Sequence, residues 1–371
     1  MHRLLEYQAN QIEMVLASHH LPSRVNGGMV TPRFIQFQVQ PALGIKLSRI
    51  QGLSEEIALS LGASSCRIYR QGGIVNIEVP RLNSEVVRLL PLCQRLPEVP
   101  PCTAVLGIDE GGMPVLLRLT SPDVAHVLIA GTTGSGKTEL TRTMITSLAL
   151  YNRLGQVQLV LIDPKGRGFT SFENLPHLLC PVIADVTQAT LTLTSLVREM
   201  ERRDREKLCE PRIVIFIDEL ADLMMAAGKT AGNALTRLAQ RGREAGIHLV
   251  GCTQKPTAAV LGSLVKSNFP ARLVGSVSSP EDAKVASGLA GTGAERLLGR
   301  GDFLIVVKGR TIRLQAAYIS PPEIAQVLDR LNQGNRTSRR WPLAATGTEG
   351  AGGNLIQKLQ QKVITQLSLV K

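Results

Sequence analysis

The sequence has few aromatic residues, scattered cysteines and no long apolar run, and each shortage argues against a class of protein. Aromatic side chains make up only 3% of the 371 residues, which argues against base stacking as the main mode of nucleic-acid contact. The six cysteines form no C-x-x-C pair, so they indicate the reduced thiols of a cytoplasmic protein, not a zinc site or a disulfide framework. No run of about 18 apolar residues could span a membrane, and the N-terminus lacks the apolar core of a signal peptide.

Basic residues outnumber acidic ones. The sequence has 42 Lys and Arg against 30 Asp and Glu, a formal net charge of +12. This excess favours a polyanionic partner, although charge alone is weak evidence for one. A hydrophobic content of 44% is enough for sizeable cores, and the length exceeds that of one usual domain.

One octet matches the phosphate-binding pattern G-x-x-x-x-G-K-[ST]. It consists of Gly131, Thr132, Thr133, Gly134, Ser135, Gly136, Lys137 and Thr138. An apolar run at 126–130 precedes it, and residues 139–150 carry apolar side chains at helical spacing, so the octet joins a strand to a helix. The glycines allow backbone N–H groups to surround the phosphates of ATP. Lys137 would neutralise phosphate charge and Thr138 would ligate Mg²⁺.

A second motif has the form of a Walker B segment. The apolar strand predicted at 212–217 ends in Asp218 and Glu219. Asp218 would hold Mg²⁺ through water, and Glu219 would orient or deprotonate the attacking water. An acid pair that merely begins a loop is the alternative interpretation.

Residues 106–330 alternate strands and helices, which predicts an α/β domain with a parallel sheet covered by helices on both faces. Two further strands end in polar groups, at Asp163 and at Thr253 and Gln254. Because ligands of such sheets bind outside the carboxyl ends of the strands, we expect four strand ends to meet at the nucleotide. Thr253 and Gln254 could contact the γ-phosphate, although a polar turn would have the same sequence.

Residues 1–105 predict a separate small α+β domain. Residues 34–39 alternate apolar side chains with Gln36 and Gln38, residues 74–79 resume a strand pattern, and Ser54 is placed to cap a helix. The prolines between 91 and 101 indicate a linker. Residues 331–371 form a third region with six Lys and Arg and one Glu, a Gly-rich stretch at 347–353 and an amphipathic helix at 355–369. That helix could be the remnant of a further module, dock a partner or be a solvated tail.

Beyond these motifs, the sequence resembles the FtsK/SpoIIIE double-stranded DNA translocases. The matching segments are residues 40–50, 126–138, 162–165, 199–203, 218–225, 237–240, 245–249 and 298–302. The resemblance covers about residues 1–330. It implies an α subdomain followed by a RecA-like β motor subdomain, with double-stranded DNA threaded through a homo-oligomeric ring of six subunits.

The resemblance also implies roles for particular basic residues. ATP sites of the family lie between subunits, and the arginine that reaches the neighbouring site aligns with Arg243, with Arg241 as the nearby rival and a solvated arginine as the plain alternative. The basic positions that face the channel fall on Lys255, Lys266 and Lys284, and a further one falls on Pro280. Any of these lysines could instead be an ordinary surface lysine.

The sequence departs from the family in three places. The segment 204–210 is short, the membrane-spanning N-terminal region is not recognisable, and neither is the winged-helix γ subdomain that sets direction in relatives. We expect an ATP-driven DNA translocase. The alternatives are a protein-exporting ATPase of the type VII secretion kind and a nucleotide-switched DNA-binding scaffold. The α-like first domain and the lysines at channel positions favour DNA over a polypeptide.

Overall fold

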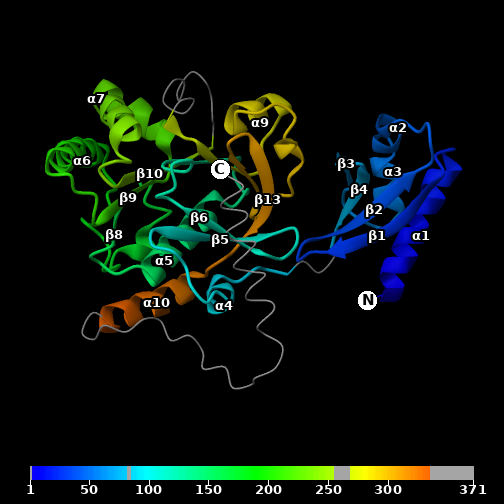
Figure 1. Ribbon diagram of the computed structural model, residues 1–371, viewed down its shortest axis with the longest axis horizontal. Coiled ribbons are helices and arrows are strands. Elements are labelled where there is room, and N and C mark those ends of the chain that lie inside the picture. The colour runs from blue at the N-terminus through cyan, green and yellow to red at the C-terminus, as the bar shows by residue number, and fades with distance from the viewer. Residues whose placement is uncertain (1, 82–84, 255–267, 335–371) are drawn as a thin grey trace. The chain divides into compact units, whose positions relative to one another are not determined.

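The computed structural model describes residues 2–81, 85–254 and 268–334. The chain forms two compact units, which Figure 1 shows as ribbons. The first contains Met1–Val87 and Glu110–Met113, and the second contains Arg88–Asp109 and Pro114–Lys371. The amphipathic helix predicted at 355–369 lies outside the described residues.

The first unit packs helices against a four-stranded antiparallel sheet. The sheet order is β1-β2-β4-β3. The elements are α1 (His2–Ser18), β1 (Ser23–Val30), β2 (Phe34–Pro41), α2 (Leu47–Gln51), α3 (Ser54–Ser60), β3 (Arg67–Gln71) and β4 (Ile74–Pro80). Ile35, Phe37 and Val39 of β2 join Ile12 and Leu16 of α1 in one core, as expected for alternate residues of a strand.

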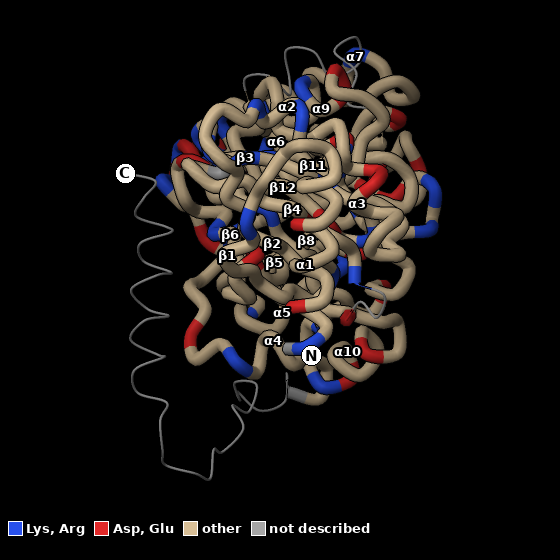
Figure 2. The backbone as a smooth tube through the Cα atoms, turned by 90° about the vertical axis from the view of Figure 1, so that its right-hand side faces the viewer, with Lys and Arg blue, Asp and Glu red and all other residues tan. Residues whose placement is uncertain are grey.

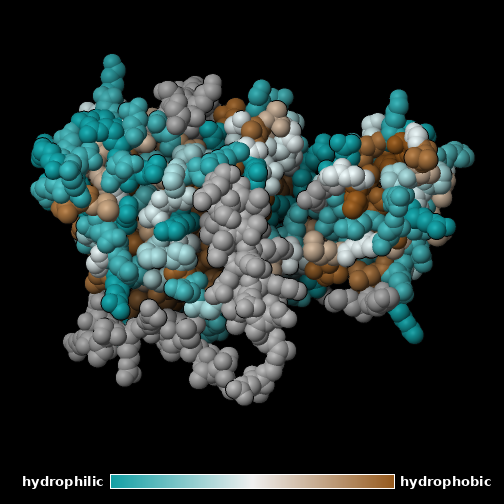
Figure 3. Space-filling model, viewed as in Figure 1, coloured by the Kyte–Doolittle hydropathy of each residue, from teal (hydrophilic) through white to brown (hydrophobic). Residues whose placement is uncertain are grey.

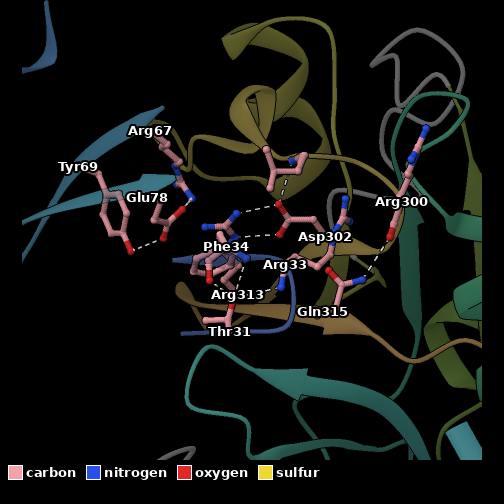
Figure 4. Close-up of polar contacts among 11 residues, drawn as sticks. Thr31, Arg33, Phe34, Arg67, Tyr69, Glu78, Arg300, Asp302, Arg313 and Gln315 are labelled. Atoms are coloured by element: carbon pink, nitrogen blue, oxygen red, sulfur yellow. Dashed lines mark hydrogen bonds and ion pairs between the residues drawn. The ribbon is translucent and has the colours of Figure 1, made fainter. Parts of the chain in front are cut away.

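The expected alternation along β2 fails at Gln36, which is buried. Its Nε2 donates a hydrogen bond to the Tyr69 hydroxyl at 3.2 Å, and that hydroxyl donates to Glu78 Oε1 at 2.6 Å. Figure 4 shows Tyr69 and Glu78 with Arg67 beside them. A glutamine is tolerated in this position because its amide is hydrogen-bonded, as buried polar groups usually are.

Two other local expectations are wrong. Ser54 is the first residue of α3, and Leu53 stands in the cap position, so the expected side-chain cap is not made. The proline-rich stretch contains α4 (Leu89–Gln94), which buries Leu89 and Leu92 within the second unit. Pro91 fits there because the first N–H groups of a helix need no partner inside it.

The second unit is built on a nine-stranded sheet with the order β6-β5-β13-β12-β11-β7-β10-β9-β8. Its strands are β5 (Thr103–Asp109), β6 (Pro114–Arg118), β7 (Val127–Ala130), β8 (Val157–Ile162), β9 (Arg212–Ile217), β10 (Ile247–Thr253), β11 (Ala271–Val274), β12 (Asp302–Val307) and β13 (Arg310–Ala316). The strands from β11 to β8 are parallel, as predicted, whereas the remaining pairs are antiparallel. The turn at Lys308 and Gly309 has positive φ at both residues and reverses the chain at once, which forces antiparallel pairing.

Helices cover both faces of this sheet, as predicted. Figure 1 shows α6 and α7 on one side and α5 and α10 on the other. The bounds are α5 (Lys137–Tyr151), α6 (Val186–Glu206), α7 (Leu220–Arg241), α9 (Pro280–Ser287) and α10 (Pro321–Gly334), with short 3₁₀ turns η1 (Thr170–Phe172) and η2 (Ala294–Arg296). The apolar sides of α6 and α7 share one core with β8, β9 and β10.

The helix α7 is interrupted at Gly228, where φ is 65° and ψ is −155°. A left-handed φ of this kind suits glycine because a Cβ would be strained there. Ion pairs join the second half of α7 to α6, with Arg237 on Glu201 and Arg241 on Asp204.

Two buried histidines lie on neighbouring parallel segments. His126 precedes β7 and His248 is within β10, and their ring centroids are 6.4 Å apart. His248 Nδ1 contacts Ala125 O at 2.9 Å, and Leu249 N donates to His126 Nδ1 at 3.0 Å. Burial lowers the pKa of His126 to about 3 and that of His248 to about 4.

Two expectations about covalent and membrane chemistry concern the whole chain. All six cysteines are free thiols. In the part of the chain that the structure describes, no helix combines the length and the apolar character that crossing a bilayer requires.

Candidate nucleotide-binding site

The structure brings the four predicted strand ends to one edge of the sheet. Parallel pairing sets Ile162 beside Ile217, Ile217 beside Gly251, and Thr253 beside Ala130. The residues that follow β7, β8 and β9 and those at the end of β10 therefore lie at the same edge. In such sheets this edge is where ligands bind.

The loop between β7 and α5 curls because three of its glycines have positive φ. The values are 155° at Gly131, 83° at Gly134 and 99° at Gly136. No atom lies within 4 Å of a Cβ added at Gly134, whereas a Cβ on Gly136 would lie 2.7 Å from Gly301 N. Gly134 is thus needed for its backbone angle and Gly136 also for close packing. The helix α5 begins at Lys137, so its N-terminus faces the space that the loop encloses.

A turn before β12 holds this loop from outside. Arg300 N donates to Gly134 O at 2.9 Å, and Gly301 N donates to Ser135 O at 2.8 Å. The turn is fixed by Asp302, whose carboxylate accepts two hydrogen bonds of 2.8 Å from the buried Arg313 guanidinium. Figure 4 shows this pair and the contact of Gln315 with Arg300. Residues 298–302 are one segment of the family resemblance, but only the structure shows what they touch.

Lys137 lies against its own loop. Its Nζ donates to Gly131 O at 2.7 Å and to Thr132 O at 3.0 Å. Burial lowers the pKa of this ammonium, while the nearby carboxylates of Glu219 and Asp218 act in the opposite direction. Thr138, the next residue of α5, is half-buried.

Glu219 is buried at the start of α7. Both carboxylate oxygens accept from Gln254 N, at 3.3 and 3.2 Å, and the Thr253 hydroxyl also hydrogen-bonds it. Burial raises the pKa of Glu219, and these hydrogen bonds lower it. The Gln254 side chain accepts from Thr133 Oγ1 at 3.0 Å. Gln254 therefore connects the phosphate loop with the acid.

Asp218 lies between charged neighbours. Burial raises its pKa and Asp163 raises it further, whereas Lys137, Lys165 and Arg142 lower it. A Cβ added at Gly168 would lie 3.2 Å from Asp218 Oδ1. The acid is thus enclosed by the loop that follows β8.

Sequence reasoning assigned no role to the basic residues that order this loop. Arg142 Nε donates to Gly168 O at 2.9 Å, and its Nη1 binds Glu139 at 2.8 Å. Lys165 Nζ lies 2.6 Å from Asp222 Oδ2. Lys165 and Asp222 both lie in segments that match the family, and this match is the only feature of the sequence that points to a role for them.

Arg243 lies at the opposite edge of the sheet, in the turn before β10. From Ile247 to Thr253 the strand spans about 20 Å at ~3.3 Å per residue. The Arg243 side chain is 44% exposed, and its Nε is 3.9 Å from the neighbouring Glu244. Arg241, its rival, is held by Asp204 at 2.7 Å.

Of the three lysines expected to contact DNA, only Lys284 is among the described residues. It is exposed on α9, which Ser279 caps and Pro280 begins. Lys255 and Lys266 lie outside the described residues. Figure 2 shows Lys and Arg interspersed with Asp and Glu along the described backbone, so charge alone does not single out one binding face.

The residues present fit a magnesium nucleotide. The glycine loop, the N-terminus of α5 and Lys137 can hold phosphates, and Thr138 and Asp218 offer the oxygen ligands that Mg²⁺ prefers. The buried Asp163 has one carboxylate oxygen without a hydrogen-bond partner among the described residues, an observation that favours a cation nearby.

Comparison with known proteins agrees with this geometry. The sequence model of the FtsK/SpoIIIE family matches residues 94–210 and 204–258, and that of the FtsK alpha domain matches residues 2–81. DNA translocase FtsK of Staphylococcus epidermidis is 36% identical over 350 residues, 86% of this chain and 43% of the relative. DNA translocase SftA of Bacillus subtilis is 37% identical over 355 residues, 87% of this chain and 37% of the relative. The chain thus spans less than half the length of these relatives.

Solved structures share the fold at lower identity. The pCW3 conjugation coupling protein TcpA has a TM-score of 0.60 at 20% identity, over 89% of this chain and 99% of that one. The type VII secretion ATPase EccC of Thermomonospora curvata has a TM-score of 0.59 at 22% identity, over 67% of this chain and 34% of that one.

Proposed function

The chain belongs to the FtsK/SpoIIIE family, and on that premise we propose that it is an ATPase that moves along double-stranded DNA. The observation that carries the proposal is the meeting of the glycine loop, Lys137, Asp218 and Glu219 at one edge of the sheet. A binding protein without turnover would have no use for a buried glutamate held beside the phosphate loop. Such a motor would work in the cytoplasm, where ATP and DNA occur together.

In this proposal the loop N–H groups from Gly131 to Thr138 and the Lys137 ammonium hold the phosphates of ATP. Mg²⁺, held by Thr138 and through water by Asp218, would neutralise charge on the β- and γ-phosphates. Glu219 orients the attacking water and accepts its proton. Gln254 lies between the loop and Glu219, so it would contact the γ-phosphate.

Arg243 completes the site of a neighbouring subunit. It lies about a strand length from its own phosphate loop, its side chain is 44% exposed, and its Nε lies 3.9 Å from Glu244. A guanidinium supplied from a neighbour would offset charge on the transferred phosphoryl group. This arrangement requires a closed ring of identical subunits, for which we propose six.

Exposed apolar side chains on the first unit also fit an assembly. On α1, Leu4, Tyr7 and Met14 are 55%, 58% and 63% exposed, and Figure 3 shows apolar patches on this unit. Large exposed apolar patches often mark interaction sites. In the ring, a neighbouring subunit would cover them.

DNA contact is proposed through Lys255, Lys266 and Lys284. Lysines act as point charges toward phosphate oxygens and read no base sequence. The described Lys284 has the exposure that such a contact needs. Motor polarity would then come from the ring face that loads first or from a partner, for which residues 355–369 are a candidate.

The proposal is tested by measuring ATP turnover of the purified chain without DNA, with unrelated linear duplexes and with single strands. Duplex of any sequence should stimulate turnover strongly, and the chain should displace a triplex-forming strand from a duplex in an ATP-dependent way. Lys137→Ala is the matched inactive control. Turnover that ignores DNA would contradict the proposal and would favour a polypeptide substrate.

A further inference from the structure

Asp163, the residue after β8, is completely buried and only half of its carboxylate is hydrogen-bonded. Oδ2 accepts from Gly168 N at 2.7 Å and from Phe169 N at 3.0 Å. Oδ1 has no hydrogen-bond partner among the described residues. An uncompensated buried carboxylate oxygen is costly, so its position calls for a donor or a cation that residues 2–81, 85–254 and 268–334 do not supply.

Asp163 lies beside Asp218 at the nucleotide edge. Their strands pair in parallel with Ile162 opposite Ile217, and Asp218 N donates to Ile162 O at 3.0 Å, so the two aspartates follow in register. Residues in register on adjacent strands direct their side chains to the same face, with a strand spacing of ~4.8 Å. Gly168 confirms the closeness, because it donates to Asp163 and a Cβ on it would lie 3.2 Å from Asp218 Oδ1.

The cations around this pair are already engaged with other groups. Lys137 Nζ binds two loop carbonyls, Lys165 Nζ binds Asp222, and Arg142 binds Glu139 and the carbonyl of Gly168. Two carboxylates at this spacing repel each other, and a divalent cation between them and the phosphates would relieve the repulsion. Because Mg²⁺ gives up its waters reluctantly, a second acid near it commonly binds such a water and not the ion itself.

We propose that Asp163 is a positioning residue of the magnesium site: Oδ2 fixes the loop 164–169, and Oδ1 accepts a hydrogen bond from a water that Mg²⁺ carries beside Asp218. This inference rests on the proposed function, since it supposes that the site binds a magnesium nucleotide. It assigns to Asp163 a part in metal binding that is separate from its part in holding the loop.

The variant Asp163→Asn separates these two parts. Its amide oxygen still accepts from Gly168 N and Phe169 N, while the negative charge and the water-binding oxygen are removed. We expect the Mg²⁺ concentration that half-saturates ADP binding, measured by calorimetry on the full chain, to rise about tenfold or more, the usual effect of removing an outer-shell partner. Without metal, the thermal midpoint should stay equal or rise, because repulsion with Asp218 is removed.

The exposed Asp185 supplies a matched control, because it also caps a backbone N–H, that of Gln188 at 2.7 Å. Asp185→Asn should leave the Mg²⁺ requirement unchanged. If Asp163→Asn does not fold, Asp163→Ser also removes the charge, and its thermal midpoint without metal shows how much the lost hydrogen bonds to Gly168 N and Phe169 N contribute to the fold.

The outcomes separate the role of Asp163 from the function of the whole site. If the wild-type chain requires Mg²⁺ for tight ADP binding and the Asp163 variant has the same requirement, the metal role of Asp163 is wrong and the proposed function stands. A lower thermal midpoint without metal, together with an unchanged Mg²⁺ requirement, would leave Asp163 only its role in holding the loop. A wild-type chain that binds ADP equally with and without Mg²⁺ would overturn both proposals.

Discussion

Replacing Arg243 by alanine should stop ATP turnover without weakening nucleotide binding by the same subunit. Its own phosphate loop lies beyond the far end of β10, about 20 Å along the strand from Ile247 to Thr253. That span exceeds the reach of an arginine side chain. We therefore expect any effect of Arg243 on chemistry to act in another copy of the chain.

The expected loss of turnover in Arg243→Ala follows from the proposed contact of the guanidinium with the transferred phosphoryl group. A guanidinium placed on the transferred phosphoryl group contributes about 10³–10⁵ in kcat, or ~4–7 kcal/mol of activation free energy. Nucleotide affinity of the variant, measured with labelled ADP, should stay close to that of the wild type because Lys137 and Thr138 are intact. Arg241→Ala is the control. Since Asp204 already holds Arg241 at 2.7 Å, its removal should change turnover little.

Mixing variants then tests where Arg243 acts. An Arg243→Ala subunit has an intact phosphate loop, and a Lys137→Ala subunit has an intact Arg243. If subunits mix at random before the ring closes, about one interface in four combines both intact parts, since each requirement is met by half of the neighbours. The mixture should recover about a quarter of the wild-type turnover, whereas each variant alone stays inactive.

Three results would refute the role of Arg243 in a neighbouring site. Wild-type turnover by Arg243→Ala alone would remove the residue from catalysis. A mixture that stays inactive, although mixed rings are present, would mean that Arg243 serves its own subunit or only the fold. Equal loss of turnover in Arg241→Ala would transfer the role to the rival arginine.

Three further predictions concern turnover, pH and DNA. Glu219→Gln should keep ATP bound but unhydrolysed, whereas Lys137→Ala should abolish binding; normal turnover of Glu219→Gln in a phosphate-release assay would contradict the assignment. His126 and His248 have folded-state pKa values of about 3 and 4, below the ordinary value of 6.5, so their stabilising contribution is complete above pH 6.5 and is lost as pH falls toward those values. At pH 5.5 each should lower the unfolding free energy by roughly 1 kcal/mol, and urea midpoints that do not fall between pH 7.5 and 5.5 would count against this. Lys284→Ala should weaken binding to unrelated duplexes equally. It should also reduce the slope of the logarithm of the binding constant against the logarithm of the salt concentration by about one for each phosphate that the lysine neutralises. A weakening that depends on the DNA sequence would indicate base contact instead.

The local parts of the site were predictable from the sequence because each is encoded within a few residues. The octet from Gly131 to Thr138 needs only its glycines, its lysine and the flanking strand and helix. Asp218 and Glu219 were recognisable because they end an apolar strand. Parallel pairing of that strand with its neighbours then brings such ends together without further information.

The remaining parts depend on contacts that are distant in the sequence. The hydrogen bond from Gly301 N to Ser135 O joins two segments that lie far apart along the chain. No pattern of neighbouring residues predicts such a contact. The burial of Gln36 depends on Tyr69 and Glu78 of other strands. The antiparallel half of the sheet was missed because strand periodicity does not reveal the direction of a partner strand.

The interrupted helix α7 makes one element serve two consecutive sites in the proposed ring. Glu219 directly precedes its first residue, Leu220, at the nucleotide edge, and Arg243 follows shortly after its last residue, Arg241. Regular hydrogen-bonded turns, which make up most of its 22 residues, are stiff along the helix axis. The exception is Gly228, whose non-helical backbone provides a joint between the two halves. In the proposed ring, the stiffness of that joint would set how far a displacement at one nucleotide site is passed to the next.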